Sequence, residues 1–598
     1  MKLSRLYSNY PKLFEAIDFV AGLNVIMAEI RLPENRGKDT HNLGKTTVGG
    51  LLDYCLLMKR EPKYFLFKHR ERFEDFIFFL EIELEDASHI TICRGVKDAT
   101  KISFKRHING HQDLSSLPLF QWDHQNVTFD RAKELLDGML DWRNLKPWSF
   151  RKGLGYLLRS QDDFQDVFQL RKFKSSHADW KPFLAHILGF NGQLVVRHYE
   201  QEVLLDEKQT TAHTIQRELG GSIEDISKIE GLLLLKQNDV EKKQTLLDRF
   251  DFRQIDKDRT KNLVEDIDEN IASLNVVRYS LNLNKKKIIA SLEEDQILFN
   301  PDEAERLFNE AGILFEGQIK KDFTQLIAFN KAITEERRLY LEEERSGIEE
   351  KLKGINAELT FLGKKRSDTL SFLGETDIFG KYKKISDEMV TLRADITTLE
   401  RQRGFLHRLQ ELRSEIRTLV EESSHLQTQI EVDVEKQNAD QASLFSTIRL
   451  FFSEIVEEVI NRKALISVAP NKEGHLEFKA QILDESGNAT SADLGHTYRK
   501  LLCCAFDLAV LRAHLDTKFP RFVYHDGVFE SLDDRKKENL LGVIRRSADL
   551  GLQLIITLID SDLPAHQTED GGLFTQDEIV LLLHDENKQG RLFKMDTW

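Results

Sequence analysis

The sequence predicts an α/β fold that is divided between the two ends of the chain, with a long α-helical hairpin inserted between them. The chain has 598 residues, which is too many for one hydrophobic core. Its ten prolines leave two long intervals without proline, 183–300 and 302–469, and proline rarely lies inside a helix. Outside these intervals, short apolar runs typical of strands alternate with helical segments.

Composition agrees with a chain that contains long helices. Charged residues make up 31% of the chain and apolar residues 40%, with 38 Phe and only 10 Pro. Disordered segments are usually rich in Pro and poor in aromatic residues, so the polar character indicates helices that face solvent. The net charge of −15 does not exclude a local basic surface, so it neither supports nor excludes nucleic-acid binding.

The four cysteines predict a reducing compartment. Cys55, Cys93, Cys503 and Cys504 form no C-x-x-C pair and accompany no histidine cluster at metal-binding spacing. The adjacent pair falls in an apolar helical run, where buried free thiols are expected. The N-terminus has no apolar signal region and no run of eighteen apolar residues occurs, so we expect a cytoplasmic protein without membrane contact.

Strand and helix signals follow one another at both ends of the chain. Residues 13–30 predict two short strands around Gly22, and residues 75–95 and 100–107 predict strands of an antiparallel sheet. After the proline-free intervals we expect a strand at 474–483, a helix at 498–515, a strand at 521–526, a helix from Asp534, and strands at 552–559 and 578–584. This alternation predicts a doubly wound α/β layer.

The two proline-free intervals carry heptad-like spacing. Apolar residues follow steps of three and four in each interval, a coiled-coil signal that Arg278, Lys285 and Ser423 interrupt. The apolar positions are Val264, Ile267, Ile271, Leu274, Leu281, Ile288 and Leu292, then Leu409, Leu412, Ile416, Leu419, Leu426 and Ile430. The simplest geometry is an antiparallel hairpin that turns near Pro301, with arms on the order of 120 Å. A bundle of shorter helices is the alternative.

These signals divide the chain into five parts. The predicted parts are the N-terminal half of a head (1–200), an ascending arm (201–300), a tip (301–328), a descending arm (329–445) and the C-terminal half of the head (446–598). If the arms double back, the two ends meet and complete one domain.

The first candidate site is a phosphate-binding loop. An apolar strand and a polar loop precede Gly44, Lys45 and Thr46, and an apolar helix follows. Lys45 would contact the β- and γ-phosphates of ATP, and Thr46 would hold Mg²⁺. Asp39 stands where the motif has its first glycine, and aspartate tolerates left-handed backbone better than most residues. The predicted nucleotide-binding residues are Asp39, Asn42, Leu43, Gly44, Lys45, Thr46 and Thr47; a surface loop with a chance GKT is the alternative.

The second candidate site lies near the other end of the chain. Asp526 ends a mostly apolar strand, as in the second phosphate motif, where an aspartate supports Mg²⁺ through water. Leu532 and Asp533 follow six and seven residues later, a position that resembles the Leu-Asp pair with which ABC-class ATPases contact the opposite subunit.

Together these residues resemble the SMC-like, ABC-class coiled-coil ATPases of DNA repair and bacterial anti-phage defence, and are most similar to short-armed bacterial members. The resemblance covers the whole architecture and implies an ABC-type P-loop head. It also implies ATP and Mg²⁺ as cofactors, a homodimer through the heads, and DNA, a nuclease-type effector and accessory subunits as partners.

The resemblance also assigns two further regions. Gln161, in the segment 150–168, would sense Mg²⁺ and the attacking water; an ordinary helix end is the alternative. Gly495, His496 and Thr497, with Ser491 nearby, occupy the position of the signature loop that binds the γ-phosphate of the opposite head. The usual Ser-Gly-Gly core is absent, so this assignment depends on position.

Two departures from the family pattern predict slow hydrolysis. Gly527 stands where the family has the glutamate that activates water, and the nearest carboxylate on that loop is Glu530. Leu558 stands where the family has the switch histidine. Loss of a positioned base costs about two to four orders of magnitude in rate, so we expect ATP to act mainly as a clamp between heads, with Glu530 as a candidate replacement base.

Three functions are consistent with the sequence. The first is an ATP-driven head dimer that couples DNA binding to an effector. The second is a coiled-coil scaffold with a degenerate nucleotide site, and the third, a simple P-loop NTPase or kinase, is disfavoured by the long arms. Basic clusters at 171–174, 284–288 and 364–366 are candidates for DNA contact or solvated helix faces.

Overall fold

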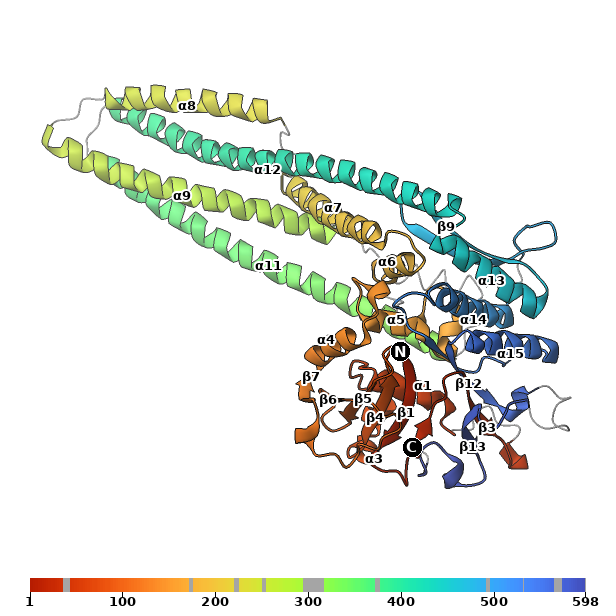
Figure 1. Ribbon diagram of the computed structural model, residues 1–598. Coiled ribbons are helices and arrows are strands. Elements are labelled where there is room, and N and C mark those ends of the chain that lie inside the picture. The colour runs from red at the N-terminus through yellow and green to blue at the C-terminus, as the bar shows by residue number, and fades with distance from the viewer. Residues whose placement is uncertain are drawn as a thin grey trace. The chain divides into compact units, whose positions relative to one another are not determined.

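The computed structural model describes residues 1–35, 43–171, 176–219, 225–249, 254–293, 317–371, 377–490, 495–530, 532–563 and 573–596. The chain forms two compact units, one of residues 1–204 with 419–598 and one of residues 205–418 (Figure 1). The predicted second half of the head begins at 446, whereas the compact unit already includes residues from Leu419.

A five-stranded parallel sheet joins the two ends of the chain. Its strand order is β13-β3-β12-β11-β8, so strands from both ends alternate in one sheet. The strands are β3 (Leu23–Glu29), β8 (Leu158–Arg159), β11 (Phe522–His525), β12 (Gln553–Ile559) and β13 (Ile579–His584). All four neighbouring pairs are parallel. The strands predicted at 521–526, 552–559 and 578–584 are therefore confirmed.

A second, six-stranded antiparallel sheet comes from the N-terminal part. Its order is β2-β1-β4-β5-β6-β7, with β1 (Lys2–Ser8), β2 (Ile17–Asp18), β4 (Ile77–Glu83), β5 (His89–Gly95), β6 (Lys101–His107) and β7 (His124–Thr128). The strands predicted at 75–95 and 100–107 are confirmed, while β1 and β7 carried no prediction. Helix α1 (Lys45–Cys55) contacts strands of both sheets.

Helices from the C-terminal part cover this unit. Helix α13 (Leu444–Ile460) packs against α14 (His496–Ala513) and α15 (Asp534–Asp549), which lie beside it in Figure 1. The hairpin of β9 (Ala464–Pro470) and β10 (Leu476–Ile482) also packs on α13. Shorter helices complete the unit: α2 (Phe65–Lys68), α3 (Arg70–Phe73), α4 (Phe129–Leu140), α5 (Phe150–Leu157) and α6 (His177–Ile187).

The second unit is helical. It contains α8 (Ile226–Asp248), α9 (Gln254–Glu293) and α11 (Gly317–Ser371), with parts of α7 (Gly192–Leu219) and α12 (Asp377–Ala439). Lys236 of α8 pairs with Asp395 of α12 at 2.6 Å, and Lys285 of α9 pairs with Glu349 of α11 at 2.9 Å. Several helices thus stand where the sequence suggested two continuous arms. Of the predicted tip, 301–316 lie outside the described residues and α11 already begins at Gly317.

Arg366 corrects one sequence expectation. It belongs to the basic cluster 364–366, which was a candidate for a solvated face or for DNA contact. Its side chain is buried, with 6% exposure, and it forms ion pairs with Asp268 of α9 (2.7 Å) and Asp387 of α12. A buried cation that is already paired with two carboxylates stabilises helix packing and is not available to DNA phosphates.

Candidate nucleotide site

The candidate residues gather at one edge of the parallel sheet. Strands β3, β8, β11 and β12 run in the same direction, so the segments that follow their carboxyl ends meet, which is where open α/β sheets bind ligands. The loop before Lys45 follows β3, Gln161 follows β8, and Asp526 follows β11. Residues almost five hundred positions apart therefore share one edge.

The end of the predicted phosphate loop has the backbone that the motif needs. Gly44 is left-handed, with φ of 101°, and lies directly before α1, whose N-terminus no described side chain caps. N–H groups at such a helix start can bind an anion. A Cβ atom at this position would lie 2.7 Å from the Cβ of Leu592, so only glycine fits. Leu43 is buried, and Asp39 and Asn42 lie outside the described residues.

Asp526 offers an oxygen suited to a metal ion. Its side chain is fully buried, and Oδ1 accepts a hydrogen bond from the Thr557 hydroxyl at 2.5 Å. Among the described residues, no hydrogen-bond partner of ordinary geometry reaches Oδ2. Burial raises the pKa of Asp526, while the hydroxyls of Thr557 and Thr46 and the ammonium of Lys45 oppose the shift. A buried carboxylate oxygen without a partner, beside Thr46, fits Mg²⁺ or a water bound to it.

Glu530 is the centre of the polar cluster. Its Oε1 accepts a hydrogen bond from Gln161 Nε2 at 2.7 Å and lies 3.5 Å from Lys45 Nζ. Its Oε2 lies 3.2 Å from Lys500 Nζ. The predicted catalytic pair, Glu530 and Gln161, is thus in direct contact, and Glu530 also lies beside the phosphate-loop lysine.

Gly527 explains how Glu530 reaches this place. Gly527 is left-handed, with φ of 66°, and a Cβ atom there would lie 2.5 Å from Glu530 Oε1 and 2.8 Å from Gln161 Nε2. The carboxylate of Glu530 therefore fills the space into which a side chain at 527 would project. Lys500 fixes the turn, because its Nζ donates to the Gly527 carbonyl oxygen at 2.8 Å.

Sequence reasoning missed Lys500 and Arg159. Lys500 lies on α14 with 3% exposure, in a run that reads as an ordinary helix. Arg159 is fully buried and donates to both carboxylate oxygens of Asp507 at 2.8 Å. It also donates to the carbonyl oxygen of Asp163 at 2.9 Å, which holds the short helix that begins at Gln161. His525 contacts the same Asp507 carboxylate at 3.0 Å.

The residues predicted to contact the opposite head lie at the N-termini of α14 and α15. Gly495 is exposed and precedes α14, with His496 and Thr497 in its first turn, while Ser491 lies outside the described residues. Asp533 caps α15 by accepting from the backbone N–H of Lys536 at 3.0 Å and pairs with its ammonium at 2.6 Å. No described contact joins Gly495 or Asp533 to the Glu530 cluster.

Leu558, predicted to stand at the switch-histidine position, lies within the parallel sheet. β12 continues through Ile559, and Leu558 is fully buried inside this strand. The next short helix brings Asp562 close enough to Lys45 and Glu530 to influence its titration: burial raises the pKa of Asp562, the Lys45 charge lowers it, and the Glu530 charge raises it.

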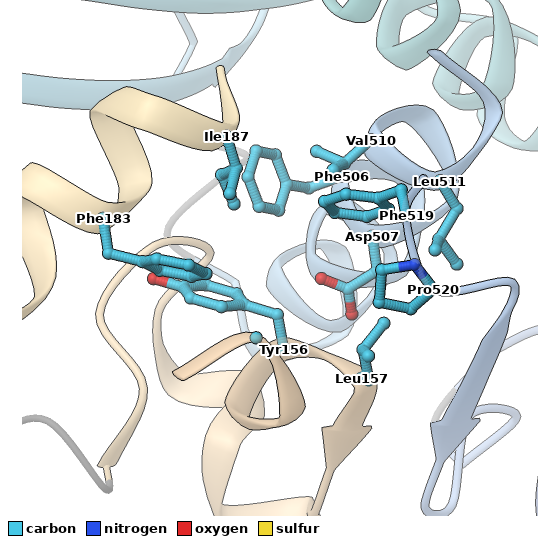
Figure 2. A pocket seen from close by; sticks show the side chains of 11 residues that line it. Tyr156, Leu157, Phe183, Ile187, Phe506, Asp507, Val510, Leu511, Phe519 and Pro520 are labelled. Atoms are coloured by element: carbon cyan, nitrogen blue, oxygen red, sulfur yellow. The ribbon is translucent and has the colours of Figure 1, made fainter. Parts of the chain in front are cut away.

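A small apolar cavity lies on the other side of Asp507. It has a volume of about 20 Å³, room for about one water molecule. Figure 2 shows its lining, in which Asp507 is the one charged side chain among mainly aromatic and aliphatic residues such as Tyr156 and Phe506. This cavity is too small and too apolar to bind a triphosphate. It is a void in the packing between α5 and α14 and not a candidate ligand site.

Comparison with protein families gives a match to the C-terminal part of the chain. Residues 455–597 match a family model described as an uncharacterised protein conserved in bacteria, DUF2326. No curated protein matches the chain. No helix within the described ranges combines the length and apolar character needed to span a bilayer.

Solved structures of Smc head domains are similar to most of the chain. A Pyrococcus yayanosii Smc head with coiled coil and joint has 13% identity and a TM-score of 0.34, with 93% of this chain and 92% of that chain covered. A Pyrococcus furiosus Smc head with extended coiled coil, bound to the C-terminal domain of ScpA, has 11% identity and a TM-score of 0.32, with 94% and 90% covered.

Proposed function

We propose that this chain is an SMC-like ATP-binding protein whose heads dimerise when ATP binds. The observation that supports the proposal most strongly is the convergence of Lys45, Gln161, Asp526 and Glu530, from both ends of the chain, at one edge of the parallel sheet. A left-handed glycine before α1 and a buried carboxylate oxygen that no described residue pairs are features that fit a phosphate and a magnesium ion.

The residues have distinct roles in this proposal. The N–H groups of α1 and the ammonium of Lys45 bind the phosphates, and Thr46 and Asp526 hold Mg²⁺. The bound ion would neutralise phosphate charge during hydrolysis. Glu530, held by Gln161 and Lys500, accepts the proton of the attacking water in place of a glutamate at 527.

Slow hydrolysis follows from the same arrangement. Glu530 is anchored by three donors, and it reaches the site from three residues further along the loop than the usual base. Lys45 must leave Glu530 to engage a phosphate. We therefore expect binding to be efficient and turnover slow, which suits a clamp.

Head dimerisation is the step that would transmit ATP binding. Gly495, His496 and Thr497 at the start of α14 would contact the nucleotide of the opposite head, and Asp533 would lie at the same interface. The side chain of Lys536, which pairs with Asp533, lies over the ring of Tyr498 at 5.1 Å, so the two helix N-termini are neighbours on one surface.

The partners in this proposal come from the family resemblance. They are DNA, a nuclease-type effector and accessory subunits, in anti-phage defence or DNA repair. Their binding would be controlled by closure of the heads.

The proposal is tested by sizing the purified protein by light scattering with and without ATP·Mg²⁺. We expect the wild type to dimerise with ATP and Asp526→Ala to remain in its nucleotide-free state. A scaffold with a degenerate site, the alternative function, predicts the same mass for both proteins under all conditions.

A further inference from the structure

Three potential metal ligands meet far from the candidate nucleotide site. His198 and Glu202 are one helical turn apart on α7, so both side chains project from one face of that helix. His475 lies between β9 and β10, more than 270 positions later in the chain. One donor atom of each residue lies within 4.8 Å of the others, and His475 Nε2 is 3.2 Å from Glu202 Oε1.

The turn that carries His475 is held rigidly. Asn471 Oδ1 accepts hydrogen bonds from the backbone N–H groups of Glu473 (2.9 Å) and His475 (3.0 Å). Gln427 of α12 donates to the carbonyl oxygen of Glu473 at 2.8 Å. The ring of Tyr199 stacks on that of His475, with centroids 4.7 Å apart. The imidazole is therefore fixed in position before any ligand arrives.

His198 is a buried imidazole with a nitrogen that no described residue pairs. His198 is 1% exposed, and no described residue contributes a hydrogen-bond partner to its Nε2. Buried imidazole nitrogens are normally paired, so an unpartnered one indicates a missing ligand.

A simpler reading is that Glu202 and His475 form an ordinary hydrogen-bonded pair and His198 is packing. That reading accounts for the 3.2 Å contact but leaves a buried nitrogen of His198 without a partner among the described residues. A cation between the three donors would satisfy all of them.

We propose that His198, Glu202 and His475 bind a divalent transition-metal ion, with Zn²⁺ as the ion that best fits two imidazoles and a carboxylate. Zn²⁺ binds such donors at about 2.0–2.2 Å, so each donor atom must move toward the ion by less than about 1 Å. Glu473, whose carboxylate is 3.8 Å from His475 Nε2, or a water molecule completes the coordination. The ion would fasten α7, from the N-terminal part of the chain, to the β9–β10 hairpin from the C-terminal part.

The test uses the full-length protein, stripped with a chelator and titrated with ZnCl₂ against a competing dye, and with CoCl₂ for its d–d absorption. We expect one Zn²⁺ per chain, a tetrahedral Co²⁺ spectrum, and a higher melting temperature with Zn²⁺. His198→Ala, Glu202→Gln and His475→Ala should each weaken binding at least about 100-fold, because removal of a ligand exceeds the usual outer-shell effect.

His213→Ala is the matched control, since His213 is an exposed histidine on the same helix. It should bind Zn²⁺ as the wild type does. If His198→Ala does not fold, the near-isosteric Glu202→Gln decides the question. A wild type that binds neither ion, or ligand variants that bind as tightly as His213→Ala, would overturn the proposal.

Discussion

The carboxylate of Glu530 folds back over Gly527, so that its Oε1 would lie 2.5 Å from a Cβ atom at position 527. A residue three positions along the loop thereby supplies a carboxylate where the sequence has a glycine. The same oxygen is bonded to Gln161 and lies beside Lys45, which places the carboxylate at the candidate phosphate site.

Glu530→Gln should lower the ATPase turnover number by about 100-fold or more, because the amide cannot accept the water proton. ATP affinity should change little, since Lys45 and the helix N-terminus remain. Single-turnover phosphate release and equilibrium nucleotide binding measure the two quantities. Glu485→Gln, at an exposed position, is the control. Unchanged turnover in the Glu530 variant would show that another group is the base.

Gly527→Ala should destabilise the protein and slow hydrolysis together. A left-handed backbone costs a residue other than glycine roughly 1–2 kcal/mol, and the new methyl group would push the Glu530 carboxylate away from Gln161. Thermal melting and turnover measure both effects. Gly542→Ala on α15, where a Cβ atom has its nearest neighbour at 3.6 Å, should be neutral or stabilising. If the two variants had the same melting temperature and the same turnover, the close approach of Glu530 to the left-handed Gly527 would be contradicted.

Lys500→Met should lower stability by about 1–3 kcal/mol, because the buried Gly527 carbonyl loses its donor. It should also reduce turnover more than ATP affinity, since Glu530 loses one of its anchors. Lys242→Met, at an exposed position of α8, is the control. If ATP affinity alone fell in the Lys500 variant, its assigned role as a positioning residue would be wrong.

The pKa of Asp526 predicts how stability depends on pH. Burial raises this pKa above the ordinary value of 3.8, so the folded protein binds the proton more tightly than the unfolded chain does. Stability of the protein without nucleotide therefore falls as pH rises from the unfolded pKa through the raised folded one, and the full cost is present once the pH exceeds the folded pKa.

Asp526→Asn should remove that cost. We expect a higher melting temperature than wild type at pH 7 without nucleotide, together with loss of the stabilisation that ATP·Mg²⁺ gives the wild type. Differential scanning fluorimetry at pH 5 to 8 compares the melting temperatures of the wild type and Asp526→Asn. Asp549→Asn, at an exposed position, is the control. A lower melting temperature at pH 7 would indicate that ionised Asp526 stabilises the empty site.

The sequence predicted those parts of the head that depend on local pattern. Strands β3, β11 and β12 are buried on both faces, so they read as apolar runs, and the loops after them carry Lys45 and Asp526 in motif order. The antiparallel strands β4 to β6 are equally clear. β8 has only two residues, which are too few to show the alternating pattern of a strand.

What the sequence could not predict depends on contacts between distant residues. Lys500 and Arg159 are charged residues that their neighbours bury, and the partner of Arg159, Asp507, lies 348 positions away. The histidines at 198 and 475 form no local motif, so no spacing rule finds them.

The most direct test of the account is equilibrium binding of ATP·Mg²⁺ to the purified full-length protein, with Lys45→Ala and Asp526→Ala measured beside the wild type. Because both side chains are proposed to serve one triphosphate, we expect the wild type to bind and each variant to lose at least about tenfold in affinity, equivalent to about 1.4 kcal/mol. Wild-type affinity in both variants, or no binding by the wild type, would contradict the claim that these two residues share a nucleotide site.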